Sequence, residues 1–164
     1  MIRTALLGIA LAGGLTLVVT DGLNAQSDPA AIVTERQDLM KGMGKSFGPL
    51  VAILKGDSTD LAAAAAAAQT MNDNITKAAT LFPAGTAKGE ATGSRAKPEI
   101  WTDTETFTAA ATALIEASAA LVVAANSGSL DTFKAAFPQV GESCGGCHAG
   151  KPKEGGKFRF PADG

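Results

Sequence analysis

Four stretches of this chain repeat apolar residues at spacings of three and four, and this rhythm limits the fold more than any other feature. The stretches cover residues 29–55, 59–82, 98–126 and 129–148, and glycine or proline separates them. Such spacing places apolar side chains on one face of an α-helix. No stretch alternates convincingly with the period of two that is typical of a half-buried strand. The sequence therefore predicts an all-α fold, an antiparallel up-down-up-down four-helix bundle.

The last of these predicted helices ends in the sequence CGGCH. Its apolar stripe continues into Cys144 and Cys147, the only cysteines of the chain, and His148, the only histidine, follows directly. Cys-x-x-Cys-His is the attachment signature of c-type haem. Two thiols on one helical face can bond to the two vinyl groups of one haem, and the next residue presents an imidazole to the iron. The motif predicts one haem c, held by two thioether bonds at Cys144 and Cys147, with His148 as an iron ligand.

Three other interpretations of the motif fit the sequence less well. A structural zinc site needs four ligands, and the chain offers three adjacent ones without a partner cluster. A thioredoxin-like pair is expected to follow a strand and open a helix, whereas this pair closes the last helix. A disulfide across two residues encloses too short a loop to stabilise the fold much.

The chain divides into three predicted segments. Residues 1–25 have a basic start at Arg3, an apolar stretch and "LNA" before the expected cleavage point, which predicts a signal peptide and export to the periplasm. An uncleaved membrane anchor is the alternative, but the apolar stretch is short for a spanning helix. Residues 26–148 form the predicted haem-binding bundle, and 149–164 a flexible tail. The net charge of −2 argues against a nucleic-acid partner.

Residues 30–148 resemble the cytochrome c′ family, the class II c-type cytochromes. The resemblance is carried by ERQDLMKGMG, LFPAGT, AKPEIW and FKAAFPQVGESCGGCH, and by the position of the haem motif near the C-terminus. It implies that Arg36 and Gln37 approach the haem propionates, and an arginine fork suits a carboxylate. Arg95 is a weaker candidate for the same contact, and Trp101 is expected in the core.

The resemblance is broken just after the histidine. Family members usually have an aromatic residue and an arginine three and four residues after it, where this chain has Lys151 and Pro152. The sequence KFR appears later, at residues 157–159, as if seven residues had been inserted. Lys151 or Arg159 is therefore a candidate for the basic position, or neither fills it.

The sixth position on the iron decides between two functions. With one histidine in the chain, methionine is the expected protein donor, and Met40, Met43 and Met71 are the candidates once Met1 leaves with the signal. Met40 is preferred, because it lies one turn after Arg36 and, by resemblance, at the position where the low-spin branch has a liganding methionine. We therefore expect His148–Met40 ligation and one-electron transfer with redox partner proteins, by a monomer or homodimer and not an enzyme. The alternative is a five-coordinate protein that binds small gases such as nitric oxide.

Overall fold

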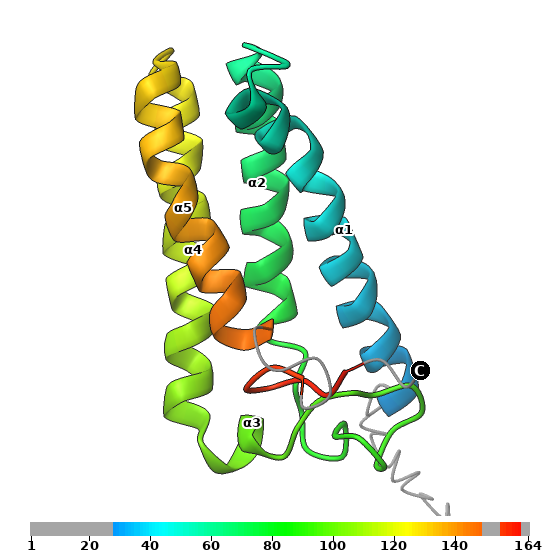
Figure 1. Cartoon of the computed structure of the whole chain (residues 1–164). Coiled ribbons are helices and arrows are strands. Elements are labelled where there is room, and N and C mark those ends of the chain that lie inside the picture. Colours follow the sequence, from blue (N-terminus) through cyan, green and yellow to red (C-terminus); the bar gives the residue numbers. More distant parts are fainter. Residues whose placement is uncertain (1–27, 149–154, 162–164) are drawn as a thin grey trace, which may run out of the picture.

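Four long helices and one short helix make up the structure, a computed structural model that describes residues 28–148 and 155–161. Within these residues the only β-type pairings are two isolated bridges. The long helices run up and down beside one another, and the short one lies at the lower end of the bundle (Figure 1). The predicted four-helix bundle is confirmed. The helices are α1 (Pro29–Lys55), α2 (Leu61–Ala78), α3 (Glu99–Thr102), α4 (Thr104–Asn126) and α5 (Leu130–His148).

The ends of α1 follow from local chemistry. The Asp28 carboxylate accepts a hydrogen bond from Ala30 N at 3.0 Å, and Pro29 occupies the first helical turn, where no backbone donor is needed. Gly56 ends the helix in the left-handed conformation, with φ of 81°, and its N–H bonds back to the last turn. The helix continues through Pro49, so its observed bounds match the predicted 29–55.

Small residues set the spacing between α1 and α2. Ala64, Ala67 and Ala68 of α2 are buried in the main core, where larger side chains would hold the helices apart. A Cβ on Gly42 of α1 would lie only 2.6 Å from Asn74 Nδ2, so this position is tight against α2. These buried alanines are therefore packing residues of the bundle.

The predicted third helix is two helices. Asp103 has φ of −130° and ψ of 57°, which interrupts the helix between α3 and α4. Its carboxylate then accepts a hydrogen bond from Thr106 N at 3.4 Å and caps α4. The prediction of one continuous helix over 98–126 was wrong here, because Asp103 is a better N-cap than a helix interior residue. The second helix also ends earlier than predicted, at Ala78.

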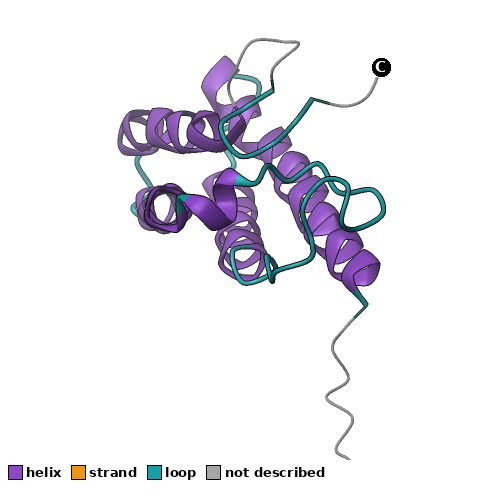
Figure 2. Ribbon diagram, turned by 90° about the horizontal axis from the view of Figure 1, so that it is seen from below, coloured by secondary structure: helices purple, strands orange, loops and turns teal. Residues whose placement is uncertain are grey.

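Residues 155–161 fold back against the lower end of the bundle, and we call them the strap (Figure 2). Phe160 N donates to Arg95 O at 2.9 Å, and Lys97 N donates to Phe158 O at 3.1 Å. Phe158 is buried at 3% exposure. The sequence led us to expect a flexible tail over all of 149–164, and for residues 155–161 these contacts correct that expectation.

Two segments of the chain bear on a possible membrane association. The predicted signal peptide, residues 1–25, lies outside the described residues. Among the described residues, α4 is long and apolar enough to cross a membrane by length and composition alone. The same composition is typical of a core helix, and α4 packs through Leu114, Ala117 and Leu121 into the main core.

Candidate functional site

A cavity of about 450 Å³ lies between the lower halves of α1 and α5, a size within the usual range of ligand pockets. Its walls are mainly apolar and come from all four long helices and from the strap. Phe82, Phe107 and Phe158 form an aromatic wall of edge-to-face contacts, with centroids of neighbouring rings 4.9 and 5.3 Å apart. Such a wall suits a flat apolar ligand. The three rings lie far apart in the sequence, so the periodicity of single helices did not reveal it.

The haem motif lines the same cavity. Cys144, Cys147 and His148 all contribute to its surface from the last turns of α5. Both cysteines are half-buried with free thiols. Cys144 faces the main core, and Cys147 packs beside Phe158 and Ile100 in the smaller core at the lower end. The predicted helix therefore brings the two thiols and the imidazole to one apolar cavity, the donor set that a covalently bound haem requires.

The electrostatics of the motif disfavour the alternative chemistries. Burial raises the pKa of both thiols, which is the opposite of a reactive redox cysteine. Partial burial of the imidazole, and then the charges of Arg159 and Arg95, lower the pKa of His148, which favours the neutral form that ligates metals. Within the described part of the chain, no three His, Cys, Asp or Glu side chains are placed to hold a metal ion by themselves.

The side chain of Arg36 is buried, but its hydrogen-bond partners all lie in the loop that follows α2. Nη1 donates to Leu81 O at 3.2 Å and Thr86 Oγ1 at 3.0 Å, while Nη2 donates to Thr86 O at 2.8 Å and Ser94 Oγ at 2.7 Å. All four terminal N–H groups are therefore used, and the guanidinium also lies 4.5 Å from the centroid of the Phe82 ring. Only the Nε–H is left for a propionate, so that role of Arg36 stays a prediction.

The other candidates from the sequence differ in whether they line the cavity. Gln37 lines the cavity, but its side-chain amide donates to Gly93 O at 2.8 Å. Met40 and Met43 both line the cavity, whereas Met71 is fully buried in the main core and does not. Trp101 packs in the smaller core and donates from Nε1 to Phe82 O, as expected of a core residue.

The strap brings an aromatic residue and an arginine to the motif from further along the chain. Phe158 lines the cavity, and Arg159 Nη1 lies 3.3 Å from His148 Nδ1. Gly156 is pressed against the backbone of the motif, since an added Cβ would clash with Cys147 O and lie 2.7 Å from His148 Cα. Of the two sequence candidates for the basic position, Arg159 lies beside His148, and Lys151 lies outside the described residues.

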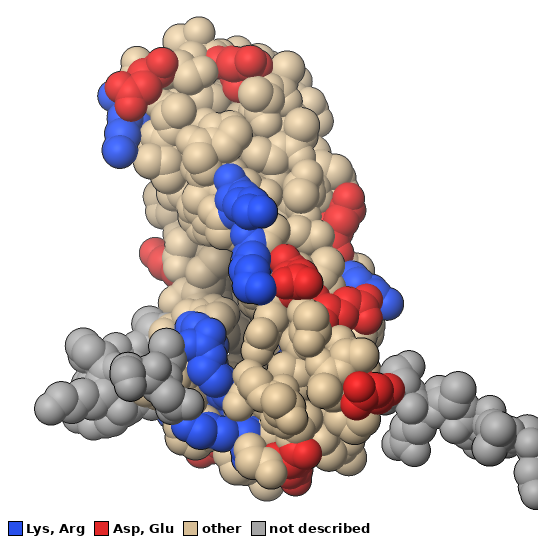
Figure 3. Space-filling model, turned by 90° about the vertical axis from the view of Figure 1, so that its right-hand side faces the viewer, with Lys and Arg blue, Asp and Glu red and all other residues tan. Residues whose placement is uncertain are grey.

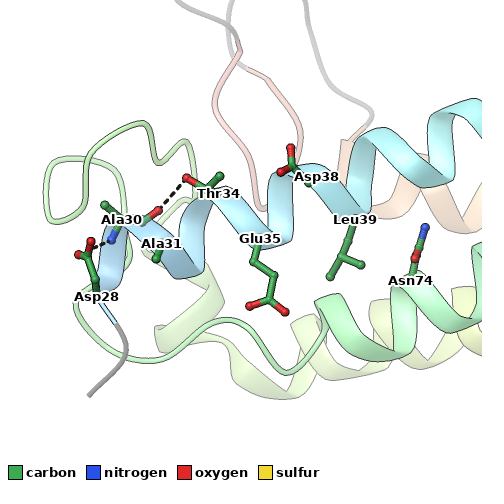
Figure 4. Close-up of a pocket in the computed structure, with 8 residues that line it drawn as sticks. All are labelled: Asp28, Ala30, Ala31, Thr34, Glu35, Asp38, Leu39 and Asn74. Atoms are coloured by element: carbon green, nitrogen blue, oxygen red, sulfur yellow. Dashed lines mark hydrogen bonds between the residues drawn. The ribbon is translucent and has the colours of Figure 1, made fainter. Parts of the chain in front are cut away.

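A second, more open hollow lies along α1 beside α2 (Figure 4). Glu35, Leu39 and Asn74 point into the space between the two helices. Glu35 is paired with Lys77 at 3.5 Å. None of the residues lining this hollow is a cysteine, histidine or aromatic residue. It therefore lacks the donor chemistry of the cavity at the haem motif.

A helical bundle with Cys-x-x-Cys-His opening into an apolar cavity defines the class of c-type haem proteins. The family model described as "Cytochrome C'" matches residues 31–150. A cytochrome c′ of Cereibacter sphaeroides is 36% identical over 124 residues, which are 74% of this chain and 83% of the relative. The chain belongs to the cytochrome c′ family, and its cofactor is a covalently bound haem c.

Solved structures agree with this assignment. The crystal structure of cytochrome c′ from Rubrivivax gelatinosus superposes with a TM-score of 0.70 at 30% identity, covering 81% of this chain and 98% of that one. A nitric oxide complex of a mutant of cytochrome c prime from Alcaligenes xylosoxidans superposes with a TM-score of 0.69 at 30% identity, covering 82% and 98%.

Proposed function

We propose that this protein is an exported haem c protein that binds a small diatomic gas, such as nitric oxide or carbon monoxide, at the iron. Cys144 and Cys147 carry the haem, and His148 is the proximal ligand. This reverses the order of preference drawn from the sequence, which put electron transfer first. Among the solved relatives is a nitric oxide complex, and this favours the gas-binding alternative.

The observation that carries the proposal is the shape of one cavity. The haem motif of α5 lines one side of it, and α1 lines another with Met40, Met43 and Phe47. Besides the thioethers of the two methionines, the α1 wall offers the Lys41 amine as a possible donor to iron, and this group is paired with the Asp38 carboxylate at 2.8 Å. Haem supplies the gas-binding iron when bound, and the protein contributes a mainly apolar cavity around it.

Electron transfer is the second candidate, and Met40 is the residue that favours it. This side chain lines the cavity and is half-exposed to it, so a thioether is available on the α1 side. A methionine axial ligand fills the sixth position and raises the reduction potential. In that case redox proteins are the partners and no open site exists for a gas.

One pair of spectra separates the two functions. Oxidised protein is examined by optical and electron spin resonance spectroscopy, wild type against Met40→Ala, with Met71→Ala as the matched control outside the cavity. The gas-binding proposal expects high-spin iron in the wild type and binding of nitric oxide by the reduced form. Low-spin iron that becomes high-spin only in Met40→Ala establishes His148–Met40 ligation and favours electron transfer instead. Low-spin iron unchanged in Met40→Ala moves the ligand to Met43.

The cellular setting is part of the same proposal. Covalent haem attachment outside the cytoplasm fits the predicted signal peptide at residues 1–25 and a periplasmic location. A membrane fraction that retained the mature protein in high salt would favour the anchor instead. The state of assembly, monomer or homodimer, is readily measured by analytical ultracentrifugation.

A further inference from the structure

Four cationic side chains line the cavity, and two of them are already committed to other partners. The four terminal N–H groups of Arg36 all donate hydrogen bonds to the 81–94 loop. Lys41 lies 2.8 Å from the Asp38 carboxylate. Arg95 and Arg159 are the other two. Neither has a carboxylate partner among the described residues.

Arg95 and Arg159 are held close together by the backbone. Phe160 N donates to Arg95 O at 2.9 Å, and Ala96 and Arg159 form an isolated antiparallel bridge. The strap therefore carries one guanidinium and the loop before α3 carries the other, at the rim of one cavity. Burial lowers the pKa of Arg159, and the neighbouring charge of Arg95 lowers it further.

Two neighbouring, half-buried cations without a counter-ion are unfavourable unless an anion joins them. On the face shown in Figure 3, Lys and Arg side chains lie along the middle of the molecule and at its lower end, where acidic side chains are also present. Haem brings its own anions, because it carries two propionate carboxylates along one edge. An arginine fork matches a carboxylate in charge and geometry.

We infer that Arg95 and Arg159 together bind a propionate carboxylate of the haem and that this shared anion fastens the strap to the bundle. The inference rests on the covalent haem and not on gas binding. It gives the C-terminal segment a function: the strap is a part of the cofactor site that closes over the haem edge. It also assigns the carboxylate to Arg95, the weaker of the candidates from the sequence, together with Arg159, and not to Arg36 and Gln37 of α1.

Resonance Raman spectroscopy of the holoprotein tests the pair directly, because the propionate bending vibrations respond to hydrogen bonding at the carboxylate. Wild type is compared with Arg95→Gln and Arg159→Gln. Lys97→Gln is the matched control, since Lys97 lies in the same loop over the Phe160 ring but does not line the cavity. We expect shifted propionate vibrations in both arginine variants and none in the control.

Amide hydrogen exchange of residues 155–161 measures the fastening of the strap. We expect exchange to accelerate about tenfold or more in both arginine variants and to be unchanged in Lys45→Gln, on the exposed side of α1. Lys45 is the control here because the Lys97 side chain lies over the Phe160 ring of the strap. Arg159→Lys, which keeps the charge without the fork, provides a milder variant with a smaller acceleration. Unchanged propionate vibrations in either Arg95→Gln or Arg159→Gln would overturn the shared site. An altered iron–histidine vibration alone in Arg159→Gln would assign Arg159 to His148 instead. Nitric oxide binding is measured in a separate experiment, so the absence of gas binding would not change the interpretation of the propionate result.

Discussion

Arg36 and Thr86 are joined twice, from Nη1 to Oγ1 at 3.0 Å and from Nη2 to the carbonyl oxygen at 2.8 Å. Thr86 Oγ1 in turn donates to Pro83 O at 2.8 Å. One side chain of α1 therefore holds the irregular loop that forms the lower wall of the cavity. The charge of Arg36 is dispersed over neutral acceptors, and burial lowers its pKa.

Replacing Arg36 by methionine should lower the free energy of unfolding by about 3 kcal/mol, because several buried acceptors lose a charged donor at once. Urea denaturation of the holoprotein measures the change. Lys45→Met, on the exposed side of the same helix, serves as the control and should stay within about 0.5 kcal/mol of wild type. A loss of less than about 1 kcal/mol for Arg36→Met would mean that the loop holds itself together.

Asp103 makes the stability of α4 depend on pH. Its hydrogen bond with the Thr106 side chain is the main cause of its lowered pKa, and a backbone bond and the Lys157 charge add to it. Because the folded pKa lies below the unfolded value, the stabilisation is complete above the ordinary aspartate range and is lost as pH falls through the folded pKa. Asp103→Asn keeps an N-cap without a charge, so the acid side of its unfolding curve should be flatter than that of wild type. Identical pH dependence in both proteins would contradict this role.

Two glycine substitutions should have opposite effects: one should release the strap, and the other should raise the free energy of unfolding. Gly156→Ala forces a Cβ against the backbone of the haem motif and should release the strap, with faster chymotrypsin cleavage after Phe158. Gly141 lies exposed in α5 with nothing near its Cβ position, so Gly141→Ala should raise the free energy of unfolding by about 1 kcal/mol. If Gly156→Ala is cleaved no faster than wild type, the strap does not lie against the motif in solution.

The covalent bonds to haem can be counted by mutation. Each of Cys144→Ala and Cys147→Ala should leave one thioether bond, and the double variant should release all of its haem into acidified organic solvent. The absorption of the extracted phase and the mass of the intact protein measure both outcomes. Extraction of haem from the wild type would disprove covalent attachment. His148→Ala provides a contrast, since it should keep the covalent bonds and lose the proximal ligand.

The parts of the fold that depend on local pattern were predictable from the sequence. The bounds of α1 followed from Pro29 and Gly56, and α5 ends at His148 as predicted. Its stripe also placed both cysteines toward the interior. The break at Asp103 was missed, although an aspartate three residues before Thr106 is a capping signal that was available in the sequence.

The long-range contacts of the site were not predictable in the same way. The bonds from Arg36 to Thr86 and Ser94 join a helix to a loop whose composition is that of any surface turn. Residues 155–161 are rich in glycine and charge, and this composition gave no sign that Phe158 is buried. Such contacts depend on the shape of the assembled bundle, and no periodicity within one segment encodes them.

The strap also has a kinetic consequence. Contacts within a helical bundle are mostly between near neighbours in sequence, which favours rapid folding. The bond between Phe160 and Arg95 instead joins residues with all of α4 and α5 between them, so forming it requires a long loop to close. We therefore expect the strap to dock after the four helices have assembled and to undock without their unfolding. The strap, which follows the four helices along the chain, is then also the last segment to reach its native position.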